Sequence, residues 1–209
     1  MSFSLNEVEA TAKRAARGAG YSWGLAEEAS KATRWLCERG VDGCVELARL
    51  LDANLASAPV EHAPQSLDSP WQASGPLCPL ATGAALSDSV AGWKAAPLEL
   101  RNVAVPALLL PFAAMAARQI GGCLSVSTGD QKAMTDGIDL EMNPAFSLPN
   151  ADVTVSSGGE ITKACACSAR ATPDPEAWAT LNRFAHRTFA PATEESRLLG
   201  AGAGLSDND

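Results

Sequence analysis

Histidine and long apolar segments are scarce in this sequence. With only two histidines, His62 and His186, it shows no Ser/His/Asp or Cys/His signature of a catalytic nucleophile. The longest apolar run covers fifteen residues, 103–117, carries two prolines and lies between Arg101 and Arg118. It is too short to cross a bilayer, which takes about 20 apolar residues, so we expect a buried helix there.

Positive charge is also in deficit, since 16 Lys and Arg face 24 Asp and Glu and the formal net charge is −8. We therefore expect neither nucleic acid nor an anionic membrane surface as a partner. No secretory signal is recognisable, because Met1 leads directly into a charged helical pattern. We expect a cytoplasmic protein in which the six cysteines are free thiols.

The first 55 residues predict a three-helix unit. Ser4 and Glu7 form a capping box for a helix over 5–17, which Gly18 would end in a left-handed conformation. A second apolar stripe at helical spacing runs from Leu25 and ends at Gly40. Asp42 is placed to cap a third helix that reaches residue 55.

The rest of the chain divides by composition into three parts. Residues 56–76 lose periodicity and gain prolines, which is typical of a linker or a surface-wrapping segment. Residues 77–190 read as an α+β domain, and 191–209 form a glycine-rich tail; one globular domain for the whole chain is the alternative. We expect strands near 98–105, 123–127, 131–135 and 138–142, a buried helix near 107–119, and a final helix from Pro175 to Phe189.

A glycine pair predicts a further hairpin. Val153 and Val155 alternate with polar residues up to Gly158 and Gly159, and 161–169 would return as the partner strand. Local hairpins mixed with two helices favour the α+β class over a doubly wound parallel sheet. The expected architecture is an N-terminal three-helix unit followed by a mixed or antiparallel sheet with two packing helices.

Two pairs of side chains and one histidine have both a chemical and a structural interpretation. Cys165 and Cys167 would share one face of the returning strand, and two thiolates suit a soft metal or redox chemistry. Packing of two small buried thiols is the alternative. Asp139 and Glu141 would likewise share a strand face, either for acid–base catalysis or as a solvated surface. His186 is either a general base or a boundary residue of the last helix.

The turn between the first two helices is a candidate anion site. Arg17, Gly18, Gly20 and Ser22 precede Glu27 in a glycine-rich segment that opens the second helix. Backbone N–H groups at a helix start and a nearby arginine (Arg14, Arg17 or Arg34) are what a phosphate or carboxylate needs. A helix cap with a tight turn is the alternative, because this segment follows a helix rather than a strand.

The tail has three interpretations. Gly200, Gly202 and Gly204 alternate before Asp207 and Asp209. The carboxylates suit Mg²⁺ or Ca²⁺ but need further ligands, so we assign no metal. Docking of the tail, with Arg197 anchoring its start and the aspartates meeting cations of the first helix, is the second interpretation, and a solvated tail is the third.

The segments RGAGYSWGLAEE near the N-terminus and GAGAGLSDND at the C-terminus together resemble the ends of an uncharacterised bacterial protein family. This resemblance implies no activity.

Our leading hypothesis is binding of a small polar or anionic metabolite between the helical unit and the sheet, with or without catalysis. We name no cofactor. The alternative is a non-catalytic assembly subunit, a homo-oligomer for example, that uses the tail and surface tryptophans Trp23, Trp71 and Trp93. The candidate ligand-binding residues are Arg17, Gly18, Gly20, Ser22, Glu27, Arg197, Gly202 and Asp207.

Overall fold

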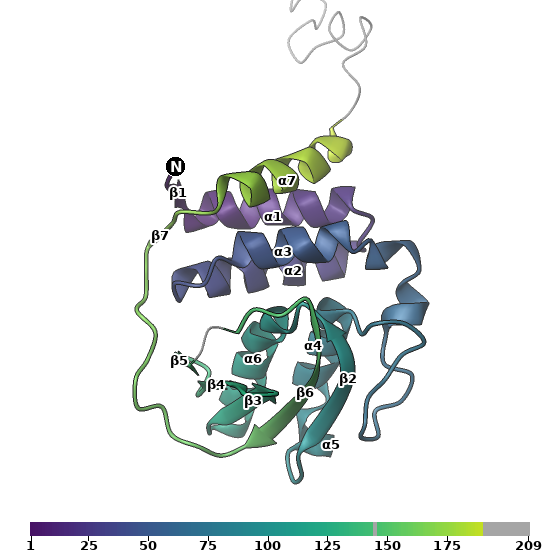
Figure 1. Cartoon of the computed structure of the whole chain (residues 1–209), viewed down its shortest axis with the longest axis vertical. Coiled ribbons are helices and arrows are strands. Elements are labelled where there is room, and N and C mark those ends of the chain that lie inside the picture. Colours follow the sequence, from purple (N-terminus) through teal and green to yellow (C-terminus); the bar gives the residue numbers. More distant parts are fainter. Residues whose placement is uncertain (144–145, 190–209) are drawn as a thin grey trace, which may run out of the picture.

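The computed structural model describes residues 1–143 and 146–189, and it has the expected α+β fold. One layer consists of helices α1 (Leu5–Gly18), α2 (Trp23–Glu38), α3 (Gly43–Asp52) and α7 (Pro175–Ala185). The second layer holds a five-stranded sheet and the helices that cover it (Figure 1). A single cluster of buried apolar side chains extends through both layers.

The helices of the first layer begin where the sequence places their caps. The Ser4 side chain accepts from the Glu7 N–H at 3.2 Å and the Glu7 carboxylate accepts from the Ser4 N–H at 2.7 Å, so the capping box is confirmed. Asp42 accepts from the Cys44 and Val45 N–H groups and caps α3. Its other carboxylate oxygen accepts from the Asp174 N–H at 2.7 Å, which ties the start of α7 to the start of α3.

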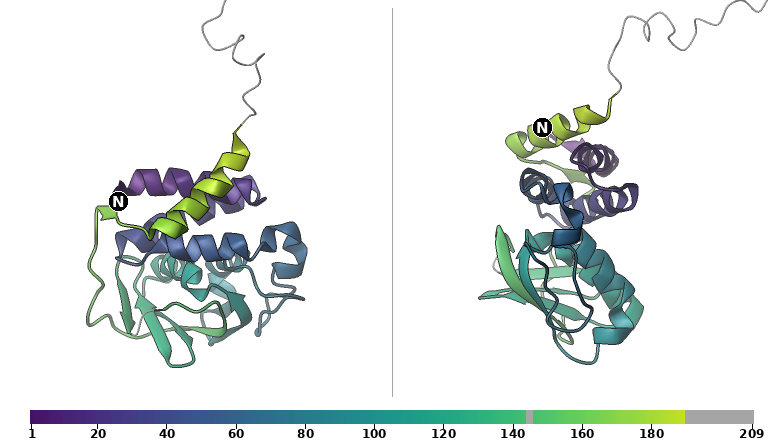
Figure 2. Two further views of the ribbon diagram at one scale, coloured as in Figure 1. Left: turned by 45° about the horizontal axis from the view of Figure 1, so that its top comes forward. Right: turned by 90° about the vertical axis from the view of Figure 1, so that its right-hand side faces the viewer.

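The last described helix returns to the first. α7 packs on α1 and α3, and Figure 2 shows it crossing over α1. Strands β1 (Phe3–Ser4) and β7 (Arg170–Ala171) pair just before these two helices, and the Phe3 ring stacks on Trp178 with centroids 4.1 Å apart. The helical layer therefore contains four long helices, three from the N-terminal segment and one from the C-terminal segment.

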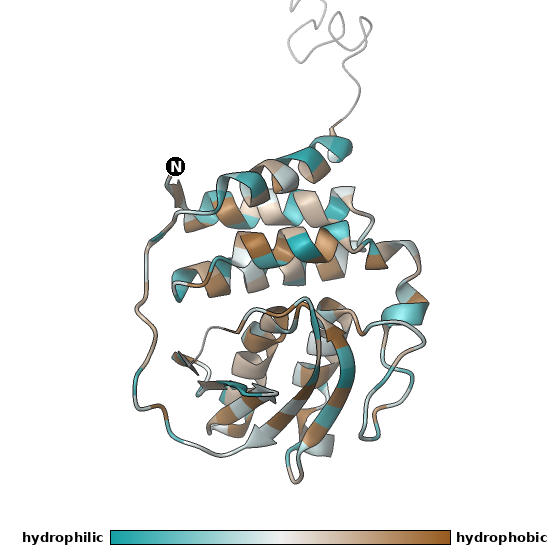
Figure 3. Cartoon of the chain, viewed as in Figure 1, coloured by the Kyte–Doolittle hydropathy of each residue, from teal (hydrophilic) through white to brown (hydrophobic). Residues whose placement is uncertain are grey.

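The sheet is antiparallel throughout, in the order β2-β6-β3-β4-β5. Its inner-face side chains, such as Val126 and Val155, are fully buried, and hydropathy alternates along β2 and β6 (Figure 3). The expected buried helix is α6 (Leu110–Ile120), which packs on β3 and β4. The strands are β2 (Leu98–Ala104), β3 (Leu124–Thr128), β4 (Gln131–Thr135), β5 (Leu140–Asn143) and β6 (Asn150–Ser157).

Residues 56–76 wrap the surface. After the short helices η1 (Leu55–Ser57) and η2 (Pro59–His62), the segment runs along the outer edge of β2. The Trp71 N–H donates to the Glu99 carbonyl at 2.8 Å, and the Arg101 N–H donates to the Trp71 carbonyl at 2.9 Å. These bonds satisfy an edge that would otherwise be open to pairing with another chain. Along the chain, this segment is followed by α4 (Pro79–Asp88) and α5 (Val90–Trp93), which come before β2. The sequence did not predict these two helices.

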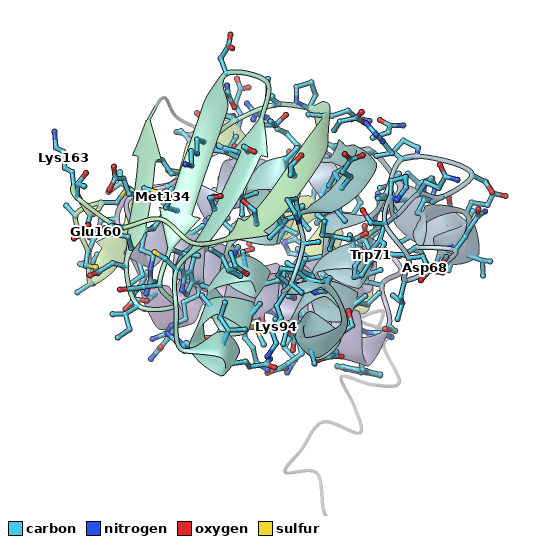
Figure 4. All side chains as sticks on the ribbon, turned by 90° about the horizontal axis from the view of Figure 1, so that it is seen from below. Asp68, Trp71, Lys94, Met134, Glu160 and Lys163 are labelled. Atoms are coloured by element: carbon cyan, nitrogen blue, oxygen red, sulfur yellow. The ribbon has the colours of Figure 1, made fainter. Side chains whose placement is uncertain are left out.

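The expected strand at 161–169 is wrong. Strand β6 already pairs with β2 on one side and β3 on the other, so no edge is left for a returning strand. Residues 158–169 instead run outside the sheet toward the helical layer, and Glu160 and Lys163 lie at the periphery (Figure 4). The Ser168 N–H reaches the Glu38 carbonyl at 2.7 Å, which joins this connection to the end of α2.

Two expectations about individual residues are also wrong. Gly18 is the last helical residue of α1 and has no positive φ; Gly20 takes that role, with φ of 105°. Trp71 and Trp93 are 0% and 7% exposed, because each covers part of the apolar core, and only Trp23 of the three presumed surface tryptophans is exposed. The six cysteines are free thiols.

Among the described residues, none of the helices combines the length and hydrophobicity that spanning a membrane requires.

Close packing of α4 on α6 gives a test of the fold. A Cβ on Gly83 would lie 2.2 Å from Cδ2 of Phe112, a residue that is 1% exposed. We expect Gly83→Ala to lower the free energy of unfolding by about 1–3 kcal/mol through overpacking. The control is Gly92→Ala in α5, where a Cβ meets nothing within 4 Å. Chemical denaturation should separate the two variants, and equal stabilities would contradict the packing described.

Candidate functional site

A pocket of about 580 Å³ opens where α1 ends, α2 begins and α7 continues into η4 (His186–Thr188). Helices α1 and α7 end at the same side of the helical layer (Figure 1), and the residues that line the pocket lie at or next to these helix ends. The pocket is thus built within the helical layer and not between that layer and the sheet. Its cationic lining side chains are Lys13, Arg14, Arg17 and Arg187.

Two glycines shape the floor of this pocket. A Cβ on Gly18 would lie 1.9 Å from the carbonyl oxygen of Phe184, so only glycine lets α7 approach α1 this closely. At Gly20, φ of 105° turns the chain out of α1. The Tyr21 N–H then donates to the Ala16 carbonyl at 3.1 Å, which closes the helix end.

Arg17 is held by contacts within this turn. Its Cζ lies 4.4 Å from the centroid of the Trp23 ring, and its Nη1 donates to the Tyr21 carbonyl. A cation over an aromatic face and at the C-terminal end of a helix is stabilised by both. Trp23 is 70% exposed, so its ring forms an apolar wall open to solvent beside the guanidinium.

Arg187 lies in η4, near the end of the described chain, and adds a positive charge to the pocket. Its Cζ lies 4.3 Å from the Phe184 ring centroid, and the Arg14 Cζ lies 6.0 Å from the Phe189 ring. Within the described part of the chain, Arg14, Arg17 and Arg187 have no carboxylate within 4 Å. Three cations thus converge on one pocket, and none of the described carboxylates pairs with them, in a protein of net charge −8.

The fourth cation is neutralised. Lys13 forms an ion pair with Glu27, and this hydrogen bond and the positive charge hold the pKa of Glu27 below its usual range. Ser22 serves as the N-cap of α2, where its hydroxyl accepts from the Leu25 N–H at 3.3 Å. Glu27 and Ser22 therefore have structural roles next to the pocket: Glu27 pairs with Lys13, and Ser22 caps α2.

The structure therefore brings together part of the predicted set. Arg17, Gly18 and Gly20 line the pocket, and Ser22 and Glu27 adjoin it. Arg34 lies elsewhere, with its Nη1 2.7 Å from the Glu9 carboxylate. The tail residues Arg197, Gly202 and Asp207 lie outside the described residues.

The other candidates occupy different positions. Residues 161–169 do not form a strand, so the prediction that Cys165 and Cys167 share a strand face is wrong. Cys165 is half-buried and Cys167 is exposed. Glu141 accepts from the Thr162 and Lys163 N–H groups at 2.6 and 2.9 Å, so it holds the connection that follows β6. His186 is exposed in η4, and its ring meets Phe189 edge-on.

Sequence reasoning missed the contributions of Arg187 and Trp23 to this site. Arg187 lies 170 positions from Arg17, and no local pattern records that α7 packs on α1. The one available signal was position, since Trp23 directly follows the glycine-rich helix end that contains Arg17. Chemically, the arrangement offers guanidinium donors and an aromatic face, which suit an anion with a flat or apolar part.

The conformation of Gly20 is open to direct test. At its φ of 105°, an alanine is strained, and we expect Gly20→Ala to lower the free energy of unfolding by about 1–3 kcal/mol. Gly24→Ala is the matched control, because Gly24 lies in the first turn of α2 and a Cβ there meets nothing within 4 Å. Thermal unfolding that ranks Gly24→Ala at or above the parent and Gly20→Ala below it would agree with the turn geometry; the reverse order would refute it.

Comparison with known proteins agrees with the expectation of an uncharacterised family. Residues 3–76 match a family described as "Protein of unknown function (DUF3726)". The matched range includes the first of the two segments that carried the resemblance and ends before the second. No curated protein matches the chain, and no solved structure does. This chain is thus similar, over its first three helices and the whole wrapping segment, to a family whose function is not known.

Proposed function

We propose that the protein binds a small anionic metabolite, a carboxylate or phosphate ester, in the pocket at the α1–α2 turn. The observation that carries the proposal is the convergence of Arg14, Arg17 and Arg187, which have no carboxylate within 4 Å in the described part of the chain. Like charges gathered in one place repel one another, and an anionic ligand relieves that repulsion. The proposal concerns binding and names no reaction.

The dimensions and chemistry of the pocket agree with a metabolite. A volume of about 580 Å³ falls within the range of about 300–1,000 Å³ that is usual for small-molecule sites. Guanidinium groups donate pairs of parallel hydrogen bonds to carboxylate and phosphate oxygens. The Trp23 ring beside Arg17 offers a flat apolar surface for the remainder of the ligand.

We further propose that the protein is bacterial and cytoplasmic. The six free thiols support a reducing compartment. The acidic surface as a whole supports a selective site rather than general binding of polyanions, because a net charge of −8 repels nucleic acid at long range.

Substitution of Arg187 tests the proposal. With citrate and inorganic phosphate as separate probes, we expect at least one to raise the melting temperature of the parent protein. Arg187→Ala should weaken its binding by about tenfold or more, since one charge-assisted contact is lost. Added NaCl should weaken binding by the parent protein through screening.

Arg183→Ala is the matched control. Arg183 is in the last turn of α7, one turn before Arg187; its side chain is 58% exposed, its Nη2 lies 3.0 Å from Asp52, and it does not line the pocket. The control should bind each probe as the parent does. Binding that is equally weak in both variants would show a general charge effect, and no binding of either probe to the parent would count against the site.

The assembly hypothesis is retained because Trp23 is 70% exposed at this pocket. It predicts that Trp23→Ser or removal of residues 190–209 lowers the number of chains per particle in solution, whereas the metabolite hypothesis predicts the oligomeric state of the parent for both. Light scattering at several protein concentrations distinguishes them. The same two variants, titrated with citrate and phosphate, show whether ring or tail contributes to anion binding.

A further inference from the structure

A second site lies at the opposite end of the helical layer, where α2 turns into α3. Cys37 is in the last turn of α2 and Cys44 is the second residue of α3. Between them Gly40, with φ of 73°, reverses the chain. The two Sγ atoms and a carboxylate oxygen of Asp42 all lie within 4.8 Å of one another.

The two thiols differ in access. Cys37 is 4% exposed and lines a pocket of about 230 Å³ together with Gly40, Asp42 and Arg170. Cys44 is fully buried behind it and does not line the pocket. A molecule that enters this pocket therefore meets Cys37 first, and Cys44 is reached only through Cys37.

The two thiols also differ in their hydrogen bonds. A hydrogen bond from the Cys44 thiol, together with the backbone N–H groups of Gly43 and Cys44, lowers the pKa of Cys37 against the opposing effects of burial and of Asp42. The hydrogen bond to Cys37 and burial both raise the pKa of Cys44. These interactions favour the thiolate on the accessible sulfur and the thiol on the buried one.

The carboxylate beside the thiols is already engaged. Asp42 accepts from the N–H groups of Cys44, Val45 and Asp174, at 3.1, 3.3 and 2.7 Å. A metal ion would have to compete with these bonds, which cap α3 and hold the start of α7. The cluster therefore suits chemistry of the two sulfurs more than metal coordination.

We propose that Cys37 and Cys44 form a dithiol that exchanges with small disulfides. The Cys37 thiolate attacks one sulfur of the disulfide, forms a mixed disulfide and releases the first thiolate. The departing thiolate takes the Cys44 proton, and the Cys44 sulfur then attacks the Cys37 sulfur and releases the second thiolate, which takes a proton from solvent. The protein pair loses two electrons to become a disulfide, and the small disulfide gains them as two thiols.

The chain supplies a second cysteine pair for comparison. Cys165 and Cys167 are closer in sequence and more exposed, whereas Cys78 is buried, with its Sγ 3.7 Å from the Tyr21 hydroxyl. If exposure or sequence spacing governed oxidation, Cys165 and Cys167 would react first. The proposal predicts instead that the buried pair at the α2–α3 turn cross-links.

The test is oxidation of the full chain with glutathione disulfide. Free thiols counted after denaturation should fall from six to four, and non-reducing peptide mapping should find Cys37 joined to Cys44. Dithiothreitol should restore all six. A Cys165→Ser/Cys167→Ser double variant should still lose two thiols, from four to two.

Single variants test the order of steps. Cys44→Ser should stop at a mixed disulfide, seen as one glutathione on Cys37, and Cys37→Ser should leave Cys44 unmodified. Mapping of the oxidised parent protein decides the matter even where a variant does not fold. No Cys37–Cys44 cross-link in the parent, a cross-link confined to Cys165 and Cys167, or thiols masked by bound zinc without a cross-link would each overturn the proposal.

Discussion

The contact between α1 and α7 at Gly18 determines the rest of the helical layer. The Phe184 carbonyl lies where any side chain at position 18 would be, so the two helices meet backbone to backbone. This contact carries η4 to the end of α1 and places Arg187 beside Arg17. The basic pocket therefore depends on a packing constraint between the two ends of the described chain, and a larger residue at 18 would separate its cations as well as its helices.

At the other end of the layer, Asp42 connects three features through one carboxylate. It caps α3, binds the Asp174 N–H at the start of α7, and lies beside the Cys37 and Cys44 thiols. Because a capping carboxylate orients the first N–H groups of α3, it also fixes the backbone that faces the Cys37 sulfur. Oxidation of the dithiol would thus act directly on the junction of α2, α3 and α7.

Local features of this fold were predictable, and non-local ones were not. The Ser4 and Asp42 caps, the stop at Gly40 and strands such as β2 and β4 follow from neighbours in sequence. The path of 158–169 depended on both edges of β6 being occupied, and the burial of Trp71 depended on the edge of β2 being free. For the same reason the sequence predicted only part of the basic pocket. The α1–α2 turn is a local feature, whereas the position of Arg187 in the pocket depends on tertiary packing.

Both proposed sites lie in the helical layer, and the five-stranded sheet contributes no residue to either pocket lining. The residues that match the uncharacterised family, 3–76, contain α1, α2 and α3 but not α7. Without the C-terminal segment that carries β7, α7 and η4, the faces of α1 and α3 that α7 covers would be exposed, Arg187 would be missing from one pocket and Arg170 from the other. The matched segment therefore lacks lining residues of both pockets. Ser168 and residues 170–173, which precede α7, line the pocket beside Cys37, and Arg187 and Thr188 of η4, which follows α7, line the basic pocket.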